Sequence, residues 1–137
     1  MKIFRTASRI VNFWLDVALI TAVLAGFCFI FFWPVRVAGS SMSPALNMSD
    51  QVIASRFAGF VGNFSEGDLV MARVEIDGET EIVIKRIADI LDDGRYFLLG
   101  DNAAISIDSR HFGPVTNRQI VARILLRYFP LSVIEIF

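Results

Sequence analysis

The chain has 137 residues, a formal net charge of −1 and an apolar fraction of 55%, which exceeds the about 45–50% that is typical of soluble domains. This length favours one domain, and the near-neutral charge argues against the basic surface that nucleic-acid binding requires. The single cysteine, Cys28, excludes an internal disulfide, and the sequence contains no metal-ligand cluster. We therefore predict no metal and no other cofactor.

The first quarter of the chain holds much of the apolar excess. Residues 17–33, VALITAVLAGFCFIFFW, carry no charge, and the preceding residues extend the run to the about 20 residues of a tilted membrane span. Trp14 and Trp33 would lie at the two interfaces, and Pro34 would end the helix. We expect a transmembrane anchor over residues 13–34. The alternatives are a cleavable secretory signal and a buried core helix.

Charged residues around this run predict its orientation. Lys2, Arg5 and Arg9 precede it, whereas only Arg36 follows it closely. The positive-inside rule therefore predicts that residues 1–12 are cytoplasmic and that residues 35–137 lie outside a plasma (inner) membrane, on its periplasmic or extracellular face. The lipid bilayer is thus one expected partner.

The pattern from residue 35 onward is mainly β. Residues 51–61, QVIASRFAGFV, and 67–76, GDLVMARVEI, are predicted strands, and Asp77-Gly78 predicts a hairpin to the next run, EIVIKRIADIL. Residues 119–129, QIVARILLRYF, fit a helix by their apolar spacing and a strand by their β-branched and aromatic content. We expect a mainly β, antiparallel domain attached to one N-terminal helix.

Lysine is rare in this chain, because only Lys2 and Lys85 among the 13 basic residues are lysines. Arginine keeps its proton in proteins, whereas a desolvated lysine can release it. If the run around Lys85 is a strand, Val83 and Ile87 share its face, and apolar surroundings would lower its pKa as a general base requires. The alternative is an exposed lysine on an edge strand.

Residues 35–50, VRVAGSSMSPALNMSD, are a candidate nucleophile loop. Gly39 permits close approach of the backbone, and Pro44 restricts the chain beyond it. A nucleophilic serine needs such a defined backbone, with N–H groups nearby to hold an oxyanion. The candidates are Ser40, Ser41, Ser43 and Ser49. A flexible linker has the same composition. The only histidine, His111, is expected to be structural or exposed rather than catalytic.

Three segments, GSSMSPAL, KRIA and GDNAAISIDSRHFGPV, occur in the order of the signature boxes of the bacterial type I signal peptidases, and they resemble those boxes. These enzymes are membrane-anchored Ser–Lys proteases that remove signal peptides. Segments 67–74 and 123–134 resemble two further strands of the family. The matching box positions are Ser41, Met42, Pro44 and Leu46; Lys85 and Arg86; and Gly100, Asp101, Asn102, Ser106, Asp108, Ser109 and Arg110, followed by Phe112, Gly113 and Val115.

The resemblance implies a serine endopeptidase that removes N-terminal signal peptides from exported preproteins through an acyl-enzyme. It implies that Ser41 is the nucleophile, that Lys85 is the general base and that Ser106 orients the lysine. Asp108 and Arg110 would pair behind the site. Small residues are expected at positions −1 and −3 of the substrate.

Further expectations concern the surroundings of the dyad. The oxyanion region would be Gly39, Ser40 and Ser41. Many family members carry a serine at the position of Gly39 as an oxyanion donor, and because this chain lacks that hydroxyl, the Ser41 N–H would be the chief donor. An extended substrate would lie beside Ile82, Val83 and Ile84. Met42 is expected to pack beneath the site, and Asp101 and Asn102 are expected to form a turn.

The chain also departs from the family pattern. The segment DILDDG replaces the usual Gly-x-Pro-Gly-Asp, and about 14 residues separate Arg86 from Asp101, which predicts a minimal form without the large inserted domain of some relatives. Other readings are a peptidase dedicated to one pilin or conjugation substrate, a mitochondrial inner-membrane peptidase, and a non-catalytic membrane-anchored β-module. Self-cleaving repressors share the Ser–Lys dyad, but they carry a DNA-binding region and no anchor.

A cluster of phenylalanines has two readings. Phe57, Phe60 and Phe64 would form either an apolar rim that enters the outer leaflet or part of an ordinary core.

Overall fold

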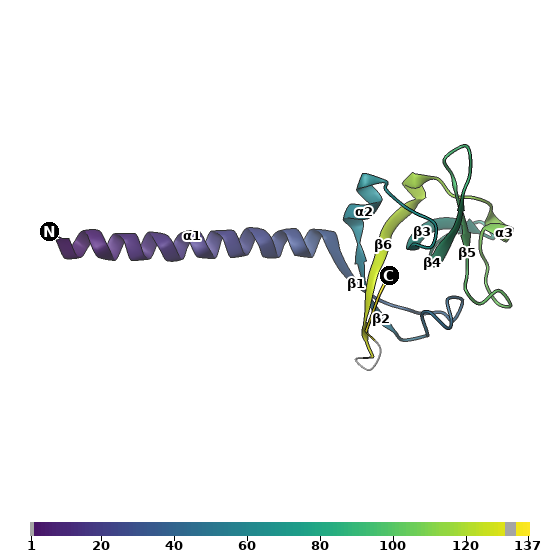
Figure 1. Ribbon diagram of the computed structural model, residues 1–137, viewed down its shortest axis with the longest axis horizontal. Helices are drawn as coiled ribbons and strands as arrows, with labels where there is room; N and C mark the ends of the chain where they lie inside the picture. The colour runs from purple at the N-terminus through teal and green to yellow at the C-terminus, as the bar shows by residue number, and fades with distance from the viewer. Residues whose placement is uncertain (1, 131–133) are drawn as a thin grey trace. The chain divides into compact units, whose positions relative to one another are not determined.

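The chain divides into two compact units, Met1–Phe31 and Phe32–Phe137 (Figure 1). The structure, a computed structural model, describes the backbone of residues 2–130 and 134–137, with side chains described for residues 12–58, 61–130 and 134–137. The closing segment 123–134, which was compared with a family strand, therefore falls partly outside the described residues, as do the side chains of Lys2, Arg5 and Arg9.

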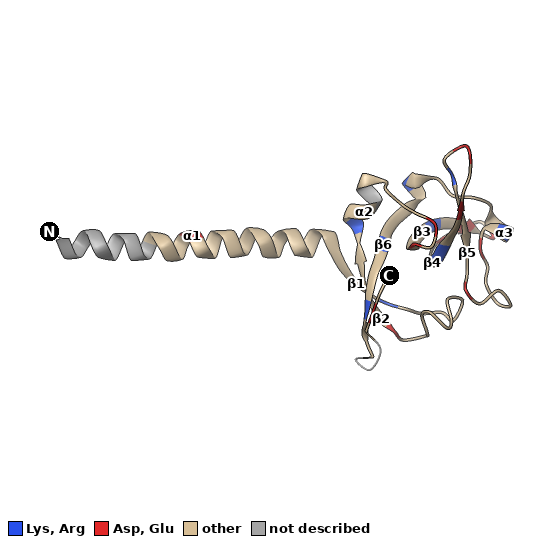
Figure 2. Ribbon diagram, in the orientation of Figure 1, with Lys and Arg blue, Asp and Glu red and all other residues tan. Residues whose placement is uncertain are grey.

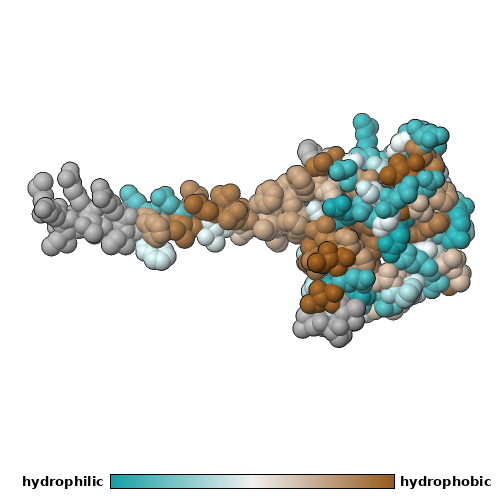
Figure 3. All heavy atoms as spheres, viewed as in Figure 1, coloured by the Kyte–Doolittle hydropathy of each residue, from teal (hydrophilic) through white to brown (hydrophobic). Residues whose placement is uncertain are grey.

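The first unit is one helix, α1 (Lys2–Phe31). Its stretch Asn12–Phe31 has a mean hydropathy of 2.2 and is long and apolar enough to cross a membrane. Figure 2 shows the described part of α1 almost free of charge, with Asp16 as the exception, and Figure 3 shows apolar side chains along most of it. The predicted helix is confirmed, whereas its insertion in a membrane stays a prediction.

The end of α1 differs from the prediction. The helix ends at Phe31, three residues before Pro34, and Phe32–Arg36 form strand β1 instead. Trp33 pairs with Ala54 and Pro34 with Ile53 in this strand. A proline disfavours helical dihedrals in the residue before it, so the helix cannot continue through Trp33. Pro34 is tolerated in β1 because this strand lies at the edge of the sheet.

The second unit is built on one antiparallel sheet, which confirms the mainly β fold. In the described residues its strands run in the order β1-β2-β6-β3-β4-β5, with β7 paired to β6. The remaining elements are β2 (Gln51–Ser55), α2 (Arg56–Val61), β3 (Leu69–Ile76), β4 (Glu79–Ile90), β5 (Tyr96–Leu99), α3 (Ser109–Phe112), the 3-10 helix η1 (Asn117–Gln119), β6 (Ile120–Phe129) and β7 (Glu135–Ile136). The segment at 119–129, left open between helix and strand, is thus mainly strand.

The predicted strand at 51–61 is correct only in its first half. β2 ends at Ser55, and Arg56–Val61 form the short helix α2. Gly62 closes α2 in the left-handed conformation, with φ 69°, and its N–H donates to the Ala58 carbonyl at 3.0 Å. The prediction of one strand over residues 51–61 did not use Gly62, which is a helix stop signal.

The three phenylalanines in this region do not share one environment. Phe57 is exposed, whereas Phe64 is buried and its ring packs edge-on against Tyr96. The side chain of Phe60 lies outside the described residues. Phe64 therefore belongs to the core, which confirms the core reading for this residue and excludes a rim formed by all three.

The Asp77-Gly78 hairpin is confirmed. Both residues have positive φ, 53° and 83°, and Ile76 pairs with Glu79 across the turn. The register that this turn fixes places Leu69 opposite Arg86 and Val70 opposite Lys85. The hairpin therefore brings the candidate base to the middle of the domain.

The core has two parts, which lie on the two faces of β3. Leu69 and Met71 pack into the first cluster, and Val70 and Ala72 into the second. The first cluster also contains Met42, which confirms that this residue packs beneath the candidate nucleophile. Burial of a Met side chain contributes about 1.5–3 kcal/mol, so the core itself anchors the loop that carries Ser41.

Candidate functional site

The candidate nucleophile loop, predicted at residues 35–50, is residues 37–50, because Val35 and Arg36 belong to β1. It joins β1 to β2 and is held at both ends. Val37 N–H donates to the Asp50 carbonyl at 2.9 Å, which closes the base of the loop. Met42 and Leu46 are buried in the core, and the Leu46 N–H donates to the Met42 carbonyl at 2.9 Å. These contacts are those of a fixed loop, and they exclude the flexible linker that its composition also allowed.

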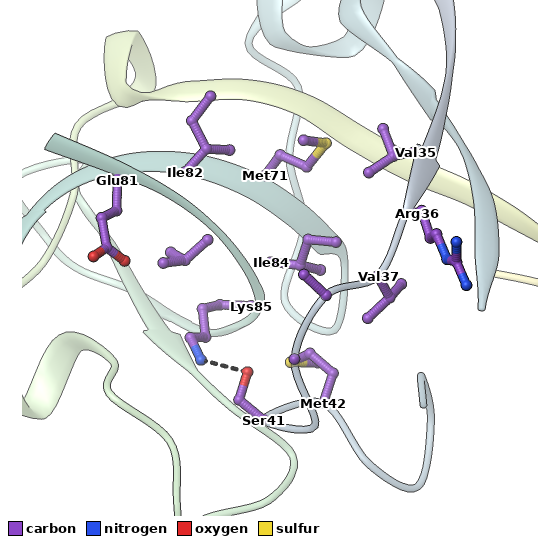
Figure 4. Close-up of a pocket in the computed structure, with 13 residues that line it drawn as sticks. Val35, Arg36, Val37, Ser41, Met42, Met71, Glu81, Ile82, Ile84 and Lys85 are labelled. Atoms are coloured by element: carbon purple, nitrogen blue, oxygen red, sulfur yellow. Dashed lines mark hydrogen bonds between the residues drawn. The ribbon is translucent and has the colours of Figure 1, made fainter. Parts of the chain in front are cut away.

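Lys85 lies beside two serine hydroxyls. Its Nζ donates to Ser41 Oγ at 2.8 Å (Figure 4). It also donates to Ser106 Oγ at 3.0 Å. The Lys85 residue is only 3% exposed, so the alternative of an exposed edge-strand lysine is wrong. Three residues far apart in sequence thus form one hydrogen-bonded set, in which Lys85 is positioned to take a proton from Ser41.

The surroundings of Lys85 favour its neutral form. Burial lowers the lysine pKa below its ordinary value. The negative charge of Asp108 raises this pKa in part, and the positive charge of Arg110 lowers it again. Because burial is the largest of the three effects, a greater share of Lys85 is unprotonated than for a lysine in water, as a general base needs.

Asp108 is a buried carboxylate with a full set of donors. The Arg110 guanidinium donates to both carboxylate oxygens at 2.8 Å, and the Gly100 N–H donates to Oδ2 at 3.1 Å. Burial would raise the Asp108 pKa, but the hydrogen bonds from Arg110, Gly100 and Ser106 outweigh it and hold this pKa well below its ordinary range. Asp108 therefore stays ionised and ties together the segment that carries Ser106.

Gly100 occupies a position with no room for a side chain. A Cβ atom there would collide with the Ser106 side chain and would lie 2.7 Å from the Ser41 carbonyl oxygen. The glycine thus allows the nucleophile loop and the Ser106 segment to approach each other.

Asn102 and Asp101 do more than form a turn. The Asn102 N–H donates to the Ser41 carbonyl at 3.0 Å, and its side-chain amide reaches the Ser40 carbonyl at 3.5 Å. Asp101 accepts two hydrogen bonds from the Arg86 guanidinium, at 2.8 and 2.6 Å. Both residues therefore connect the third box to the first two, a role that their turn-forming chemistry did not indicate.

Arg127 is a site-supporting residue that the sequence reasoning missed. It is buried on β6, and its Nη1 donates to the Ala45 carbonyl and to Asp50 Oδ2, each at 2.9 Å. Asp50 Oδ2 also accepts from the Asn47 N–H at 2.9 Å. The usable signal was an arginine inside the apolar run QIVARILLRYF, since a buried charge requires a partner.

A cavity of about 300 Å³ leads to the dyad. Val35–Gly39 form one wall and Glu81–Lys85 the other, with Ser41 at the end (Figure 4). The predicted oxyanion residues Gly39 and Ser41 and the predicted substrate-strand residues Ile82, Val83 and Ile84 all line it. Ser40 instead lies in the adjoining turn, where its carbonyl accepts from the Ser43 N–H at 3.1 Å.

The cavity wall at β4 has a free edge. β3 pairs with one edge of β4 throughout this stretch. On the other edge β5 pairs only at Arg86–Ile90, and the described residues place no strand beside 81–85 on that edge. An unpaired strand edge along a cleft is suited to binding an extended peptide through main-chain hydrogen bonds.

His111 lies away from this arrangement. It is on α3 and lines a different cavity of about 190 Å³, together with Glu75 and Phe112. The described residues contain no group of three or more His, Cys, Asp or Glu side chains that could hold a metal ion. The group that contacts the Ser41 hydroxyl is the amine of Lys85.

Comparison with known proteins agrees with this geometry. The family model described as "Signal peptidase, peptidase S26" matches residues 10–90 and 88–129. The chain is 33% identical over 117 residues to the mitochondrial ATP-independent inner membrane protease subunit 1a of Arabidopsis thaliana, covering 69% of each chain. It is 30% identical over 117 residues to the mitochondrial inner membrane protease subunit 1 of Homo sapiens, covering 72% of this chain and 70% of the relative.

A bacterial relative matches over a shorter stretch. The signal peptidase IB of Staphylococcus aureus (strain N315) is 40% identical over 45 residues, which is 33% of this chain and 24% of the relative. The family match extends over most of the chain, from the apolar helix to the end of β6. The chain therefore belongs to the signal peptidase family, peptidase S26.

Proposed function

We propose that this chain is a membrane-bound serine endopeptidase that removes N-terminal signal peptides from exported preproteins through a Ser–Lys dyad. The observation that carries the proposal is the 2.8 Å contact between the buried Lys85 amine and Ser41 Oγ at the end of an open cleft. Membership of the signal peptidase family supports the reaction class.

The first half of the proposed reaction forms an acyl-enzyme. The neutral Lys85 amine accepts the Ser41 Oγ proton as Oγ attacks the scissile carbonyl carbon, and the carbonyl oxygen becomes an oxyanion. The tetrahedral intermediate collapses with cleavage of the C–N bond, and the Lys85 ammonium gives its proton to the departing amine. Ser106, 3.0 Å from Nζ, keeps the lysine aimed at Ser41.

The second half regenerates the enzyme. A water molecule loses a proton to Lys85 and attacks the ester carbon, and the Ser41 oxygen then leaves and recovers that proton. The Ser41 N–H is the proposed chief oxyanion donor, with Gly39 and Ser40 completing this region. Gly39 lines the cavity, and a Cβ atom there would meet no atom within 4 Å, so the oxyanion region has unfilled space.

The proposed substrate binds as an extended strand beside the free edge at Ile82, Val83 and Ile84. Small residues are proposed at position −1, beside the Ser41 and buried Met42 that line the cavity, and, one strand period away, at −3. These preferences are those expected for signal peptides, which end in small residues.

The proposed location is a plasma (inner) membrane, with residues 1–12 cytoplasmic and the β unit outside. The proposed anchor is residues 13–31 of α1 rather than the predicted 13–34, because residues 32–34 belong to β1. Ser41 follows Pro34 by seven residues, which reach at most about 25 Å even when fully extended. A nucleophile within that distance of the anchor is accessible to a bond that lies just outside a signal peptide's apolar core. The names of two relatives make a mitochondrial inner membrane the alternative location.

The test is cleavage of a purified preprotein by the full chain in detergent and in liposomes, compared with Ser41→Ala, Lys85→Ala and His111→Ala. We expect the first two variants to lose at least about a thousandfold in kcat/KM, because each removes a member of the dyad. His111→Ala is expected to stay active.

Two outcomes would contradict the proposal. If a folded His111→Ala lost cleavage while Lys85→Ala kept its activity, the base would be His111 and the proposed role of Lys85 would be wrong. Failure of the wild type to cut any of a panel of preproteins would favour a dedicated substrate or a non-catalytic module.

A further inference from the structure

A second cavity continues the substrate cleft beyond Ile82. It measures about 340 Å³ and shares the side chains of Met71 and Ile82 with the cavity that leads to the dyad. In Figure 4 these two side chains lie at the end of the cleft away from Ser41 and Lys85. The two cavities therefore adjoin at these two side chains.

Two arginines make the second cavity electropositive. Arg56 and Arg73 both line it, and its described lining contains no acidic side chain. The Arg56 guanidinium carbon lies 4.2 Å from the centre of the Trp33 ring, a cation–π contact that orients it. Arg73 lies opposite Ile82 in the β3–β4 register, so the two side chains share one face of the sheet.

The residues of the cleft walls indicate in which direction a signal peptide would bind. From the second cavity to the dyad, one wall runs from Trp33 to Ser41 and the other from Ile82 to Lys85. Trp33 follows the end of α1 by two residues, about 7 Å of chain. A signal peptide's apolar core precedes the scissile bond, so its N-terminal side would point toward the anchor and hence toward Trp33.

We infer that the second cavity, lined by Arg56 and Arg73, is a charge-selective subsite for an acidic substrate side chain upstream of the cleaved bond, an inference that rests on the proposed function. Ile82 precedes Lys85 by three residues on β4, so at about 3.3 Å per residue the subsite receives one of positions −4 to −6. A Glu or Asp carboxylate there lies between two guanidinium groups, whereas a lysine is repelled by both.

The experiment uses peptides that differ only in carrying Glu, Gln or Lys at position −4, −5 or −6, cleaved by the full chain in a neutral detergent at low salt. The expected result is about a fivefold higher kcat/KM for Glu than for Lys at one of these positions, falling as salt is added. In Arg56→Gln/Arg73→Gln the Glu/Lys ratio falls to about one, and in Arg56→Glu/Arg73→Glu it reverses.

The matched control is Arg118→Gln, which removes an exposed arginine of η1 that lines neither cavity. This variant keeps the wild-type Glu/Lys ratio. A wild-type ratio near one at all three positions, or a ratio that the double Gln variant leaves unchanged, overturns the inference. The assay is repeated in phosphatidylglycerol vesicles. If Arg56→Gln/Arg73→Gln loses activity equally on the Glu, Gln and Lys peptides, and only in these vesicles, the two arginines bind a lipid headgroup and the inference is overturned.

A binding measurement separates this inference from the proposed function. The same peptides are titrated into Ser41→Ala and followed by fluorescence anisotropy, which reports the subsite without turnover. If the wild type cleaves nothing but Ser41→Ala binds the Glu peptide about fivefold more tightly than the Lys peptide, the proposed function fails and the subsite stands. If the wild type cleaves and the two Kd values are equal, the subsite alone fails.

Discussion

The pKa of Lys85 depends on its burial and on the charges of two neighbouring side chains. Burial lowers its pKa, Asp108 raises it and Arg110 lowers it. Arg110 also holds the Asp108 carboxylate through two hydrogen bonds of 2.8 Å. One exposed arginine therefore adjusts the proton affinity of the buried amine by its own charge and by neutralising a neighbouring one.

Replacement of this arginine should move the pH profile of the enzyme. Arg110→Gln removes a positive charge that lowers the Lys85 pKa and leaves the Asp108 charge, which raises it, less compensated, so this pKa rises. Because the neutral amine is the active form, the acidic limb of the kcat/KM–pH profile should shift to higher pH. Kinetics on one peptide across the pH range would measure the shift.

The control is Arg95→Gln, which removes an exposed arginine paired with Asp93 in a turn. Its acidic limb should coincide with that of the wild type. A shift of the Arg110→Gln limb to lower pH would show that the charges act on Lys85 in the opposite sense.

Gly100 affects the site through steric contact with its immediate neighbours. Gly100→Ala places a methyl group against Ser106 and 2.7 Å from the Ser41 carbonyl oxygen. Relief of that contact has to separate the nucleophile loop from Ser106, so we expect kcat to fall by about a hundredfold or more while KM changes little. Steady-state kinetics measure both constants.

Gly39→Ala is the matched control, since a Cβ atom there meets no atom within 4 Å. This change should keep the circular dichroism spectrum and the melting temperature of the wild type. Full activity of Gly100→Ala would mean that the two loops can move apart without consequence for the dyad.

At the scale of elements, the nucleophile loop is held by a strand that is distant in sequence. Arg127 on β6 reaches the Ala45 carbonyl and Asp50 within the loop, and Nη2 donates to Glu135 on β7 at 2.9 Å. The Arg127 and Asp50 side chains are each 7% exposed, so this ion pair is buried. Strands β6 and β7 thus support the loop through the contacts of Arg127.

Removal of one partner should destabilise the protein strongly. Arg127→Met leaves the Asp50 carboxylate buried without its cation, which costs about 3 kcal/mol, or about 10 °C or more in Tm. Thermal melting of the full chain in detergent would measure the shift.

The double variant Asp50→Asn/Arg127→Met should recover part of this loss, because the buried charge is gone. Arg118→Met, at an exposed position, should leave Tm within about 2 °C of the wild type. If Arg127→Met melted like the wild type, the ion pair would not hold the loop.

At the scale of the whole molecule, the chain separates into an apolar helix and a β unit with its own core. The two core clusters lie entirely within Phe32–Phe137. The β unit nevertheless exposes apolar side chains, including Met48, Phe129 and Ile136. Figure 3 shows brown, apolar patches on this unit. Both core clusters and the Ser41–Lys85 contact thus lie within the β unit, and we expect α1 to supply membrane attachment.

A chain that begins at Phe32 should separate these roles. In detergent it should cleave a short peptide with kcat/KM within about threefold of the full chain, because every contact of the dyad is retained. On a preprotein in liposomes it should lose at least about tenfold, because the anchor no longer concentrates enzyme and substrate in one membrane. A folded but inactive truncated chain would show that the dyad needs α1.

Much of the fold and site could be predicted from local sequence. The apolar helix, the Asp77-Gly78 hairpin and the β character of the second unit follow from hydropathy, turn chemistry and alternation, which act over a few residues. The helix at Arg56–Val61 was missed because a short apolar run fits both periods, and Gly62 decided between them. Arg127 was missed because its partners are distant in sequence.

The residues available for chemistry can be read from the amino-acid sequence: one lysine outside the N-terminal segment, a serine in a Gly-, Ser- and Pro-rich stretch, and an ordered set of boxes that resembles a known family. The folded chain was needed to show that Lys85 is buried and 2.8 Å from Ser41, that Gly100 lets two loops meet, and that a second cavity lined by Arg56 and Arg73 adjoins the cleft. Composition and short-range pattern set what a side chain can do. Burial and non-local strand pairing set its pKa, its partner and its access to substrate.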